Sequence, residues 1–277
     1  MAIRASFRQP GIMLHKIILR ISRRRTAHLR RSSLIALLGA AAILAFAGPS
    51  RAEVSVDVLY DLRHTADPKD NANNFPVIEL KLFFPQSFGS FLMKSEIDLD
   101  GANHNQSQTY TELSQSLKLG NATLGGKPLF VHLGYSGGLG SFNDGQGSFY
   151  IHNAFQLGLE YGFQVQGAFC NVYAALRYTT FQKPSYDPMI SLYAGRYFFN
   201  YKLLIANSLE AWTTSRDQGP ATDNVTGKFA SWELETEVWY KVAGKLSVGT
   251  YVRTTRNVYS TNDRWTLYPS FGARYSF

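Results

Sequence analysis

The sequence predicts an all-β protein, a transmembrane antiparallel up-and-down β-barrel of about 12 strands with both termini in the periplasm. Three observations lead to this prediction. The chain ends in an alternating strand at Phe277, it begins with a basic and then apolar leader, and about twelve runs of roughly ten residues lie between them.

The final strand alternates without a break from Trp265 to Phe277. One face carries Trp265, Leu267, Pro269, Phe271, Ala273, Tyr275 and Phe277, and the other carries Thr266, Tyr268, Ser270, Gly272, Arg274 and Ser276. Period two indicates a strand, and aromatic residues at both ends of the apolar face are typical of one that crosses a bilayer. It resembles the closing strand of bacterial outer-membrane barrels, which implies the barrel-assembly machinery as a partner. A soluble sandwich strand is the alternative.

The N-terminal segment has the organisation of a secretory signal peptide. A basic stretch without acidic residues precedes an apolar run at 34–47, and the small residues of Ser50-Arg51-Ala52 follow. Fourteen apolar residues are too few for a membrane-spanning helix, which needs about 20. We therefore expect a cleaved signal peptide at 1–52 and a barrel at 53–277, with translation starting at Met1 or Met13.

The positive charge of the chain belongs to this leader. It holds ten of the 28 Lys and Arg residues and none of the 20 Asp and Glu residues, so the mature chain carries 18 positive and 20 negative charges. The formal charge of +8 is therefore no sign of a nucleic-acid partner. The single cysteine, Cys170, cannot form an internal disulfide, and the histidines lack zinc-like spacing, so we expect no metal and no cofactor.

Twelve alternating runs account for most of the mature chain. Their approximate ranges are 54–63, 75–85, 90–99, 109–119, 128–138, 149–161, 170–181, 188–198, 202–213, 229–241, 245–256 and 264–277. The connections tend to alternate between short turns, expected in the periplasm, and longer polar loops, expected outside the cell. Two connections, 120–127 and 162–169, are longer than this scheme expects.

Charged residues fall on one face of each run. Because a charge in the bilayer costs several kcal/mol, we expect this face to line the lumen. The predicted lining has acidic, basic and aromatic members: Asp57, Asp61, Glu79, Glu96, Asp98, Glu112, Glu210, Glu233, Glu235, Glu237, Lys81, Lys94, Lys118, Arg177, Arg253, Arg274, Phe83, Tyr110, Tyr173, Tyr193, Trp212, Trp239, Tyr251 and Tyr268.

Three consecutive inward glutamates, Glu233, Glu235 and Glu237, are the sharpest local feature, and Arg253 on the next run is the nearest candidate to compensate them. Two interpretations remain open. The charges could form a neutralising ladder that holds the barrel, or a constriction whose polar groups and aromatic faces bind a solute. The candidate solute-binding residues are Glu233, Glu235, Glu237, Arg253, Arg177, Tyr173, Tyr193 and Trp212.

Four stretches carry a family resemblance: NNFPVIELKLFFPQSFGSFLMKSEIDLDG (73–101), FCNVYAALRYTTF (169–181), NSLEAW (207–212) and YPSFGARYSF (268–277). On these the chain resembles the nucleoside-specific channel-forming (Tsx-like) outer-membrane proteins and related uncharacterised barrels. The resemblance implies a monomeric twelve-stranded barrel in the outer membrane of a Gram-negative bacterium, with a narrow pore for nucleosides.

The sequence therefore predicts an outer-membrane channel for passive diffusion of small solutes, without enzymatic activity. A structural or adhesive barrel with a closed lumen is the main alternative. A lipid-modifying enzyme would need a lipid-facing serine–histidine site, for which His132 with Ser136 or His152 with Ser148 are the candidates, but we expect both pairs to face the lumen.

Overall fold

The computed structural model describes residues 52–100, 106–141, 147–180, 185–216, 226–258 and 263–277. The predicted leader, its cleavage site at Ala52 apart, lies outside these residues. The described chain forms twelve strands and one short helix: β1 (Glu53–Asp61), α2 (Arg63–Ala66), β2 (Phe75–Gln86), β3 (Gly89–Asp98), β4 (Gln108–Leu124), β5 (Lys127–Ser141), β6 (Ser148–Val165), β7 (Ala168–Thr179), β8 (Ser185–Phe198), β9 (Leu203–Ser215), β10 (Lys228–Ala243), β11 (Leu246–Arg256) and β12 (Trp265–Ser276).

The strands form a closed antiparallel barrel in which each strand pairs with its neighbours in sequence and β12 pairs with β1. The backbone N–H of Phe277 donates to the carbonyl oxygen of Val54 at 2.9 Å, which extends this seam to the last residue. Closure removes every free strand edge, as lipid exposure requires. The predicted fold class and strand number are confirmed.

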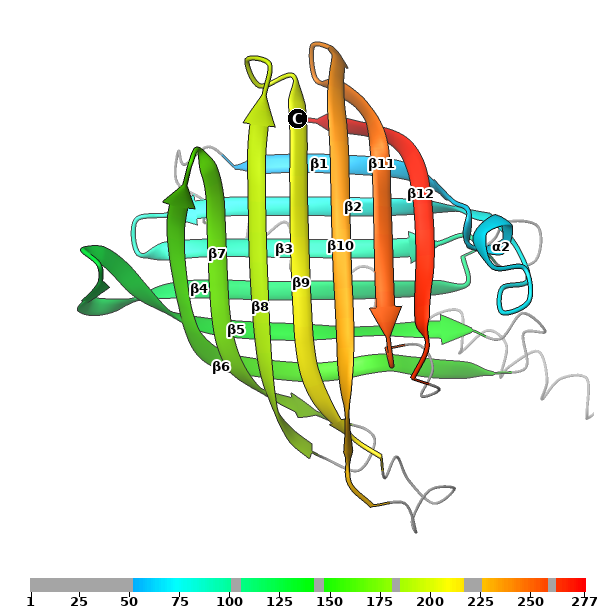
Figure 1. Cartoon of the computed structure of the whole chain (residues 1–277), viewed down its shortest axis with the longest axis horizontal. Coiled ribbons are helices and arrows are strands. Elements are labelled where there is room, and N and C mark those ends of the chain that lie inside the picture. Colours follow the sequence, from blue (N-terminus) through cyan, green and yellow to red (C-terminus); the bar gives the residue numbers. More distant parts are fainter. Residues whose placement is uncertain (1–51, 101–105, 142–146, 181–184, 217–225, 259–262) are drawn as a thin grey trace, which may run out of the picture. The chain divides into compact units, whose positions relative to one another are not determined.

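Short turns and long connections lie at opposite ends of the barrel, and the C-terminus lies at the end with the β8–β9 and β10–β11 turns (Figure 1). The sequence-based boundaries at 120–127 and 162–169 were wrong, because β4 runs to Leu124 and β6 to Val165. Two residues remain in each turn, Gly125-Gly126 (φ 58° and 77°) and Gln166-Gly167 (φ 48° and 79°). Positive φ at both central positions matches the right-handed twist of a hairpin, and glycine adopts it freely.

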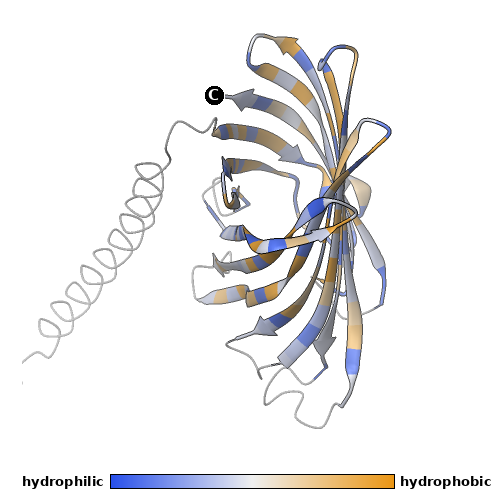
Figure 2. Ribbon diagram, turned by 90° about the vertical axis from the view of Figure 1, so that its left-hand side faces the viewer, coloured by the Kyte–Doolittle hydropathy of each residue, from blue (hydrophilic) through white to orange (hydrophobic). Residues whose placement is uncertain are grey.

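The outer surface is apolar between two sets of aromatic residues. Exposed aliphatic side chains occupy the outward positions, among them Val58, Leu157, Leu176, Ile190 and Leu267. Exposed aromatic side chains lie toward the long loops (Tyr150, Tyr186, Trp265) and toward the short turns (Phe199, Tyr201, Phe277). Figure 2 shows polar and apolar residues alternating along the strands. This is the pattern of a barrel that faces lipid. No helix in the described part is long and apolar enough to span a bilayer.

Gly272 allows β12 to approach β1 closely at the seam. A Cβ atom at this position would clash with the backbone carbonyl oxygen of Val58. We expect Gly272→Ala to lower the free energy of unfolding by about 1–3 kcal/mol, as overpacking does, measured by denaturant unfolding in lipid vesicles. Gly162→Ala is the control, because the nearest atom to its Cβ is 3.9 Å away. Equal stability of the two variants would contradict a steric requirement at the seam.

Candidate functional site

The inward face of the barrel brings together charged residues from strands far apart in the sequence. Figure 1 shows β1–β6 and β7–β12 as two walls that cross one behind the other. Between them lies a cluster that we call the charged bridge. Its members are Asp57, Glu79, Lys81, Lys94, Glu96, Glu233, Glu235, Glu237, Tyr251, Arg253 and Arg274.

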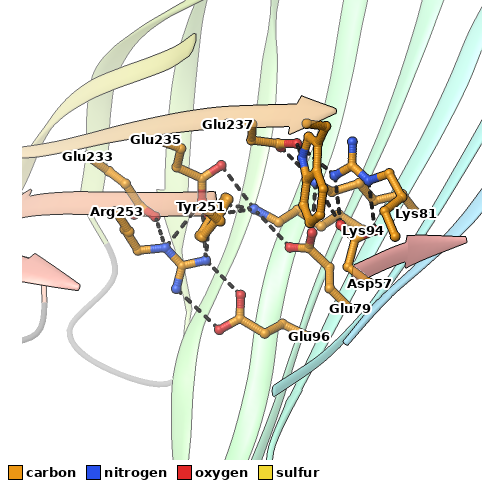
Figure 3. A network of polar contacts seen from close by, with 12 residues as sticks. Asp57, Glu79, Lys81, Lys94, Glu96, Glu233, Glu235, Glu237, Tyr251 and Arg253 are labelled. Atoms are coloured by element: carbon orange, nitrogen blue, oxygen red, sulfur yellow. Dashed lines mark hydrogen bonds and ion pairs between the residues drawn. The ribbon is translucent and has the colours of Figure 1, made fainter. Parts of the chain in front are cut away.

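Two lysines cross the lumen from β2 and β3 to β10. The Nζ atom of Lys81 donates to Glu237 Oε1 at 2.7 Å, and that of Lys94 donates to Glu235 Oε1 at 2.8 Å. These contacts join positions 156 and 141 residues apart in the chain. The two walls are therefore linked by ion pairs across the interior (Figure 3).

Arg253 makes a third link between the walls. Its Nη2 atom lies 2.7 Å from Glu96 Oε2 on β3, and its Nε atom lies 3.1 Å from Glu233 Oε1 on β10. Its Nη2 also lies 3.2 Å from Glu235 Oε1. Arg253 thus contacts two of the three consecutive glutamates, as the sequence suggested.

The third glutamate has a different partner, which sequence reasoning missed. Arg274 on β12 donates to Glu237 Oε2 at 2.7 Å and holds both oxygens of Asp57 at 2.7 Å. Its guanidinium lies over the ring of Trp239 at 4.1 Å, and the Trp239 indole donates to Glu237 at 2.8 Å. The contact between Arg274 and Asp57 could have been found from the sequence, because strand pairing sets these two residues opposite each other across the β1–β12 seam.

The charged bridge carries a small negative excess. Six carboxylates (Asp57, Glu79, Glu96, Glu233, Glu235, Glu237) face four basic groups (Lys81, Lys94, Arg253, Arg274), a formal charge of −2 with every acid ionised. Tyr251 stands among them and donates to Glu235. An excess of carboxylates around a constriction favours cations.

A second polar cluster faces the lumen from β4, β5 and β6 of one wall and from β7 and β9 of the other. Glu160 accepts hydrogen bonds from Ser116 (2.6 Å) and Asn171 (2.7 Å) and lies 3.0 Å from His132 Nδ1. The His132 ring stacks on Tyr173 with centroids 3.9 Å apart, and the Tyr173 hydroxyl donates to Glu210 at 2.8 Å. Tyr173 and Glu210 were predicted to line the lumen, whereas Glu160 was not.

The eight candidate solute-binding residues therefore do not form one site. Glu233, Glu235, Glu237 and Arg253 belong to the charged bridge, whereas Tyr173 belongs to the second cluster. The buried Arg177 guanidinium lies 5.2 Å from the Trp212 ring and donates to Thr179 at 2.8 Å. The Tyr193 ring packs against Phe169 with centroids 5.8 Å apart, on the part of β8 nearer the short turns.

The catalytic alternative can be compared with these contacts. His132 and its candidate partner Ser136 are both buried, and the two ring nitrogens of His132 lie 3.0 Å from Glu160 Oε2 and 3.3 Å from Gln156 Oε1. The side chain of His152 lies outside the described residues. Among the described residues, no group of three or more His, Cys, Asp or Glu side chains is arranged to hold a metal ion.

No family model and no curated protein matches the chain. Several solved structures are similar to the chain over most of its length. The NanC porin has 12% identity and a TM-score of 0.47 over 81% of this chain and 98% of that one. The KdgM porin in complex with disordered oligogalacturonate has 13% identity and a TM-score of 0.43 over 80% and 99%. LpxR from Salmonella typhimurium has 10% identity and a TM-score of 0.46 over 81% and 100%. Membership of the nucleoside-specific channel family stays a prediction.

Proposed function

We propose that the protein is a narrow channel in the outer membrane of a Gram-negative bacterium, through which small solutes diffuse passively. The observation that carries this proposal is the chemistry of the lumen. The groups that cross it are ionic side chains on flexible stems, and the side chains of Lys81 and Glu233 each keep 20% of their surface accessible. Water therefore reaches the charged bridge, and hydrated groups of this kind line selective pores.

Nucleosides are the solute class that we favour. A nucleoside offers a planar base that stacks on an aromatic ring and hydroxyls that hydrogen-bond to amides and carboxylates. Strands β6, β7 and β9 present both kinds of group: Tyr173 lies near Gln156 and Glu210, and the Arg177 guanidinium lies over the Trp212 ring. The resemblance found in the sequence points to the same solute, and no cofactor enters the proposal.

A structural or adhesive barrel with a closed lumen is the second candidate. The observation in its favour is that the ion pairs of the charged bridge reach from wall to wall. In this case any interaction with a partner would belong to the long loops.

Single-channel conductance in a planar bilayer separates the two candidates. For the refolded mature protein we expect small discrete conductance steps that a nucleoside blocks and a sugar of similar size does not. Tyr173→Leu should weaken the block about tenfold, because stacking of a base on an aromatic ring contributes roughly 1–3 kcal/mol. Tyr178→Leu, on the outward face of the same strand, should leave the block unchanged. Correctly folded but silent barrels would contradict the channel and favour the closed lumen.

We also propose that the barrel works as a monomer among outer-membrane lipids and that the barrel-assembly machinery inserts it through its closing strand. A catalytic role is not part of the proposal. The support for a non-catalytic role is that His132 faces the lumen and bonds to Glu160 and Gln156, away from lipid. Hydrolysis of phospholipid by the purified barrel, lost in His132→Ala, would contradict it.

A further inference from the structure

Each link of the charged bridge ends on a basic side chain that has a second partner on its own wall. Lys81 on β2 lies 2.7 Å from Glu79 Oε1 on the same strand and 3.6 Å from Asp57 Oδ2 on β1. Lys94 on β3 lies 3.5 Å from Glu79 Oε2. Both lysines therefore have a carboxylate within reach that does not cross the lumen.

The same holds for the glutamates on the opposite wall. Glu237 keeps the guanidinium of Arg274 at 2.7 Å if Lys81 leaves it, and Glu235 keeps Arg253 at 3.2 Å if Lys94 leaves it. Arg253 in turn keeps Glu233 at 3.1 Å if it releases Glu96. Separation of the walls would leave the two lysines and these far-wall carboxylates with ionic partners.

Glu79 is the centre of this arrangement on the β2–β3 wall. Its side chain is 1% exposed, and within the described part of the chain neither carboxylate oxygen has a donor in hydrogen-bond geometry, although Lys81 Nζ lies 2.7 Å from Oε1. The ammonium groups nearby donate instead to Glu237 and Glu235. A buried carboxylate can accept several hydrogen bonds, so Glu79 holds unused acceptor capacity directly beside both lysines.

We propose that Glu79 is the positioning residue that receives Lys81 and Lys94 when the charged bridge opens for a solute. Lys94 exchanges Glu235 for Glu79, whereas Lys81 releases Glu237 and keeps the contact that it already makes with Glu79. The lumen then widens without leaving an unpaired ammonium group. This exchange makes opening more favourable, because a buried charge that loses its partner is strongly destabilising. The inference rests on the proposed channel, whose gating step it supplies.

Single-channel recording tests the effect on opening. Glu79→Gln should lower the open probability severalfold, whereas Glu235→Gln combined with Glu237→Gln should raise it, because the far-wall acceptors are weakened. Asp70→Asn, in a solvent-exposed ion pair with Arg264, is the control and should leave the open probability unchanged. An open probability in Glu79→Gln equal to or above that of the parent would overturn the proposal.

A double-mutant cycle tests the lysine exchange without relying on conductance. Denaturant midpoints in lipid vesicles are compared for the parent, Glu79→Gln, the pair Glu235→Gln with Glu237→Gln, and all three substitutions together. If Glu79 holds both lysines in the absence of the far-wall acids, Glu79→Gln should lower the denaturant midpoint more in the protein that also carries Glu235→Gln and Glu237→Gln than in the parent. Additive midpoints would overturn the role of Glu79 even if the channel conducts. Non-additive midpoints together with folded barrels that do not conduct would contradict the proposed channel but not the pairing of Glu79 with the lysines.

Discussion

Arg253→Gln is expected to lower the free energy of unfolding of the barrel by about 3–5 kcal/mol, since it removes one partner from a buried ion-pair network. Arg253 is 7% exposed and is the basic group that contacts Glu96, Glu233 and Glu235 together. Glutamine can donate to one of these carboxylates but cannot neutralise them. Equilibrium unfolding by urea in lipid vesicles measures the change.

Arg256→Gln, three residues further along β11, is the matched control. Its side chain is 38% exposed and lies 3.6 Å from the carboxylate of Asp263, so the substitution should cost no more than about 1 kcal/mol. A loss of stability in Arg253→Gln no larger than in this control would show that water, rather than Arg253, compensates the glutamates. The charged bridge would then contribute little to holding the two walls together.

The sequence predicted the barrel well because the period of a strand is visible in the residues themselves. Along β10, Glu233, Glu235 and Glu237 alternate with Leu234, Thr236 and Val238, and the pairing with β11 sets Glu235 opposite Arg253. The strand ends were harder to predict at β4 and β6, which have 17 and 18 residues. In β4 the alternation of polar and apolar residues stops after Leu119, five residues before the strand ends. In β6 it continues through Phe163 to Val165, so the full length of this strand was visible in the sequence.

The contacts across the lumen could not be predicted from the sequence. Lys94 and Glu235 stand on strands that are not neighbours in the barrel, and their meeting depends on strand tilt and on how far the walls are apart. The Arg253–Glu96 pair has the same origin. Strand pairing supplies partners only between neighbours, so the sequence could assign Arg253 to Glu235 but could not assign Lys94 to it.

The contacts between the walls affect both stability and selectivity, because the same side chains link the two walls and set the charge of the lumen. Tightening the charged bridge stabilises the barrel but narrows the path for solutes. Removing a basic member loosens the network and also increases the negative excess. A substitution in the charged bridge should therefore change both unfolding and ion preference, whereas one on the outer face should change neither ion preference nor solute block.

Lys94→Gln is expected to raise the cation-to-anion permeability ratio roughly tenfold. The substitution removes one positive charge from the charged bridge, which shifts its formal charge from −2 to −3. One unit charge acting on a passing ion at about 10 Å, with an effective dielectric constant of about 20, contributes about 1.7 kcal/mol, favourable for a cation and unfavourable for an anion. Salt at about 0.1 M screens this interaction over about 10 Å, which reduces the combined effect on the ratio to roughly tenfold. Reversal potentials under a salt gradient in planar bilayers measure the ratio, which should approach that of the parent at high salt because screening weakens the interaction.

Lys228→Gln is the control, because this lysine is 45% exposed and pairs with Asp187 away from the charged bridge. If both variants keep the parent's reversal potential, ions do not pass the charged bridge, and the conducting path runs along the second polar cluster, around His132 and Tyr173.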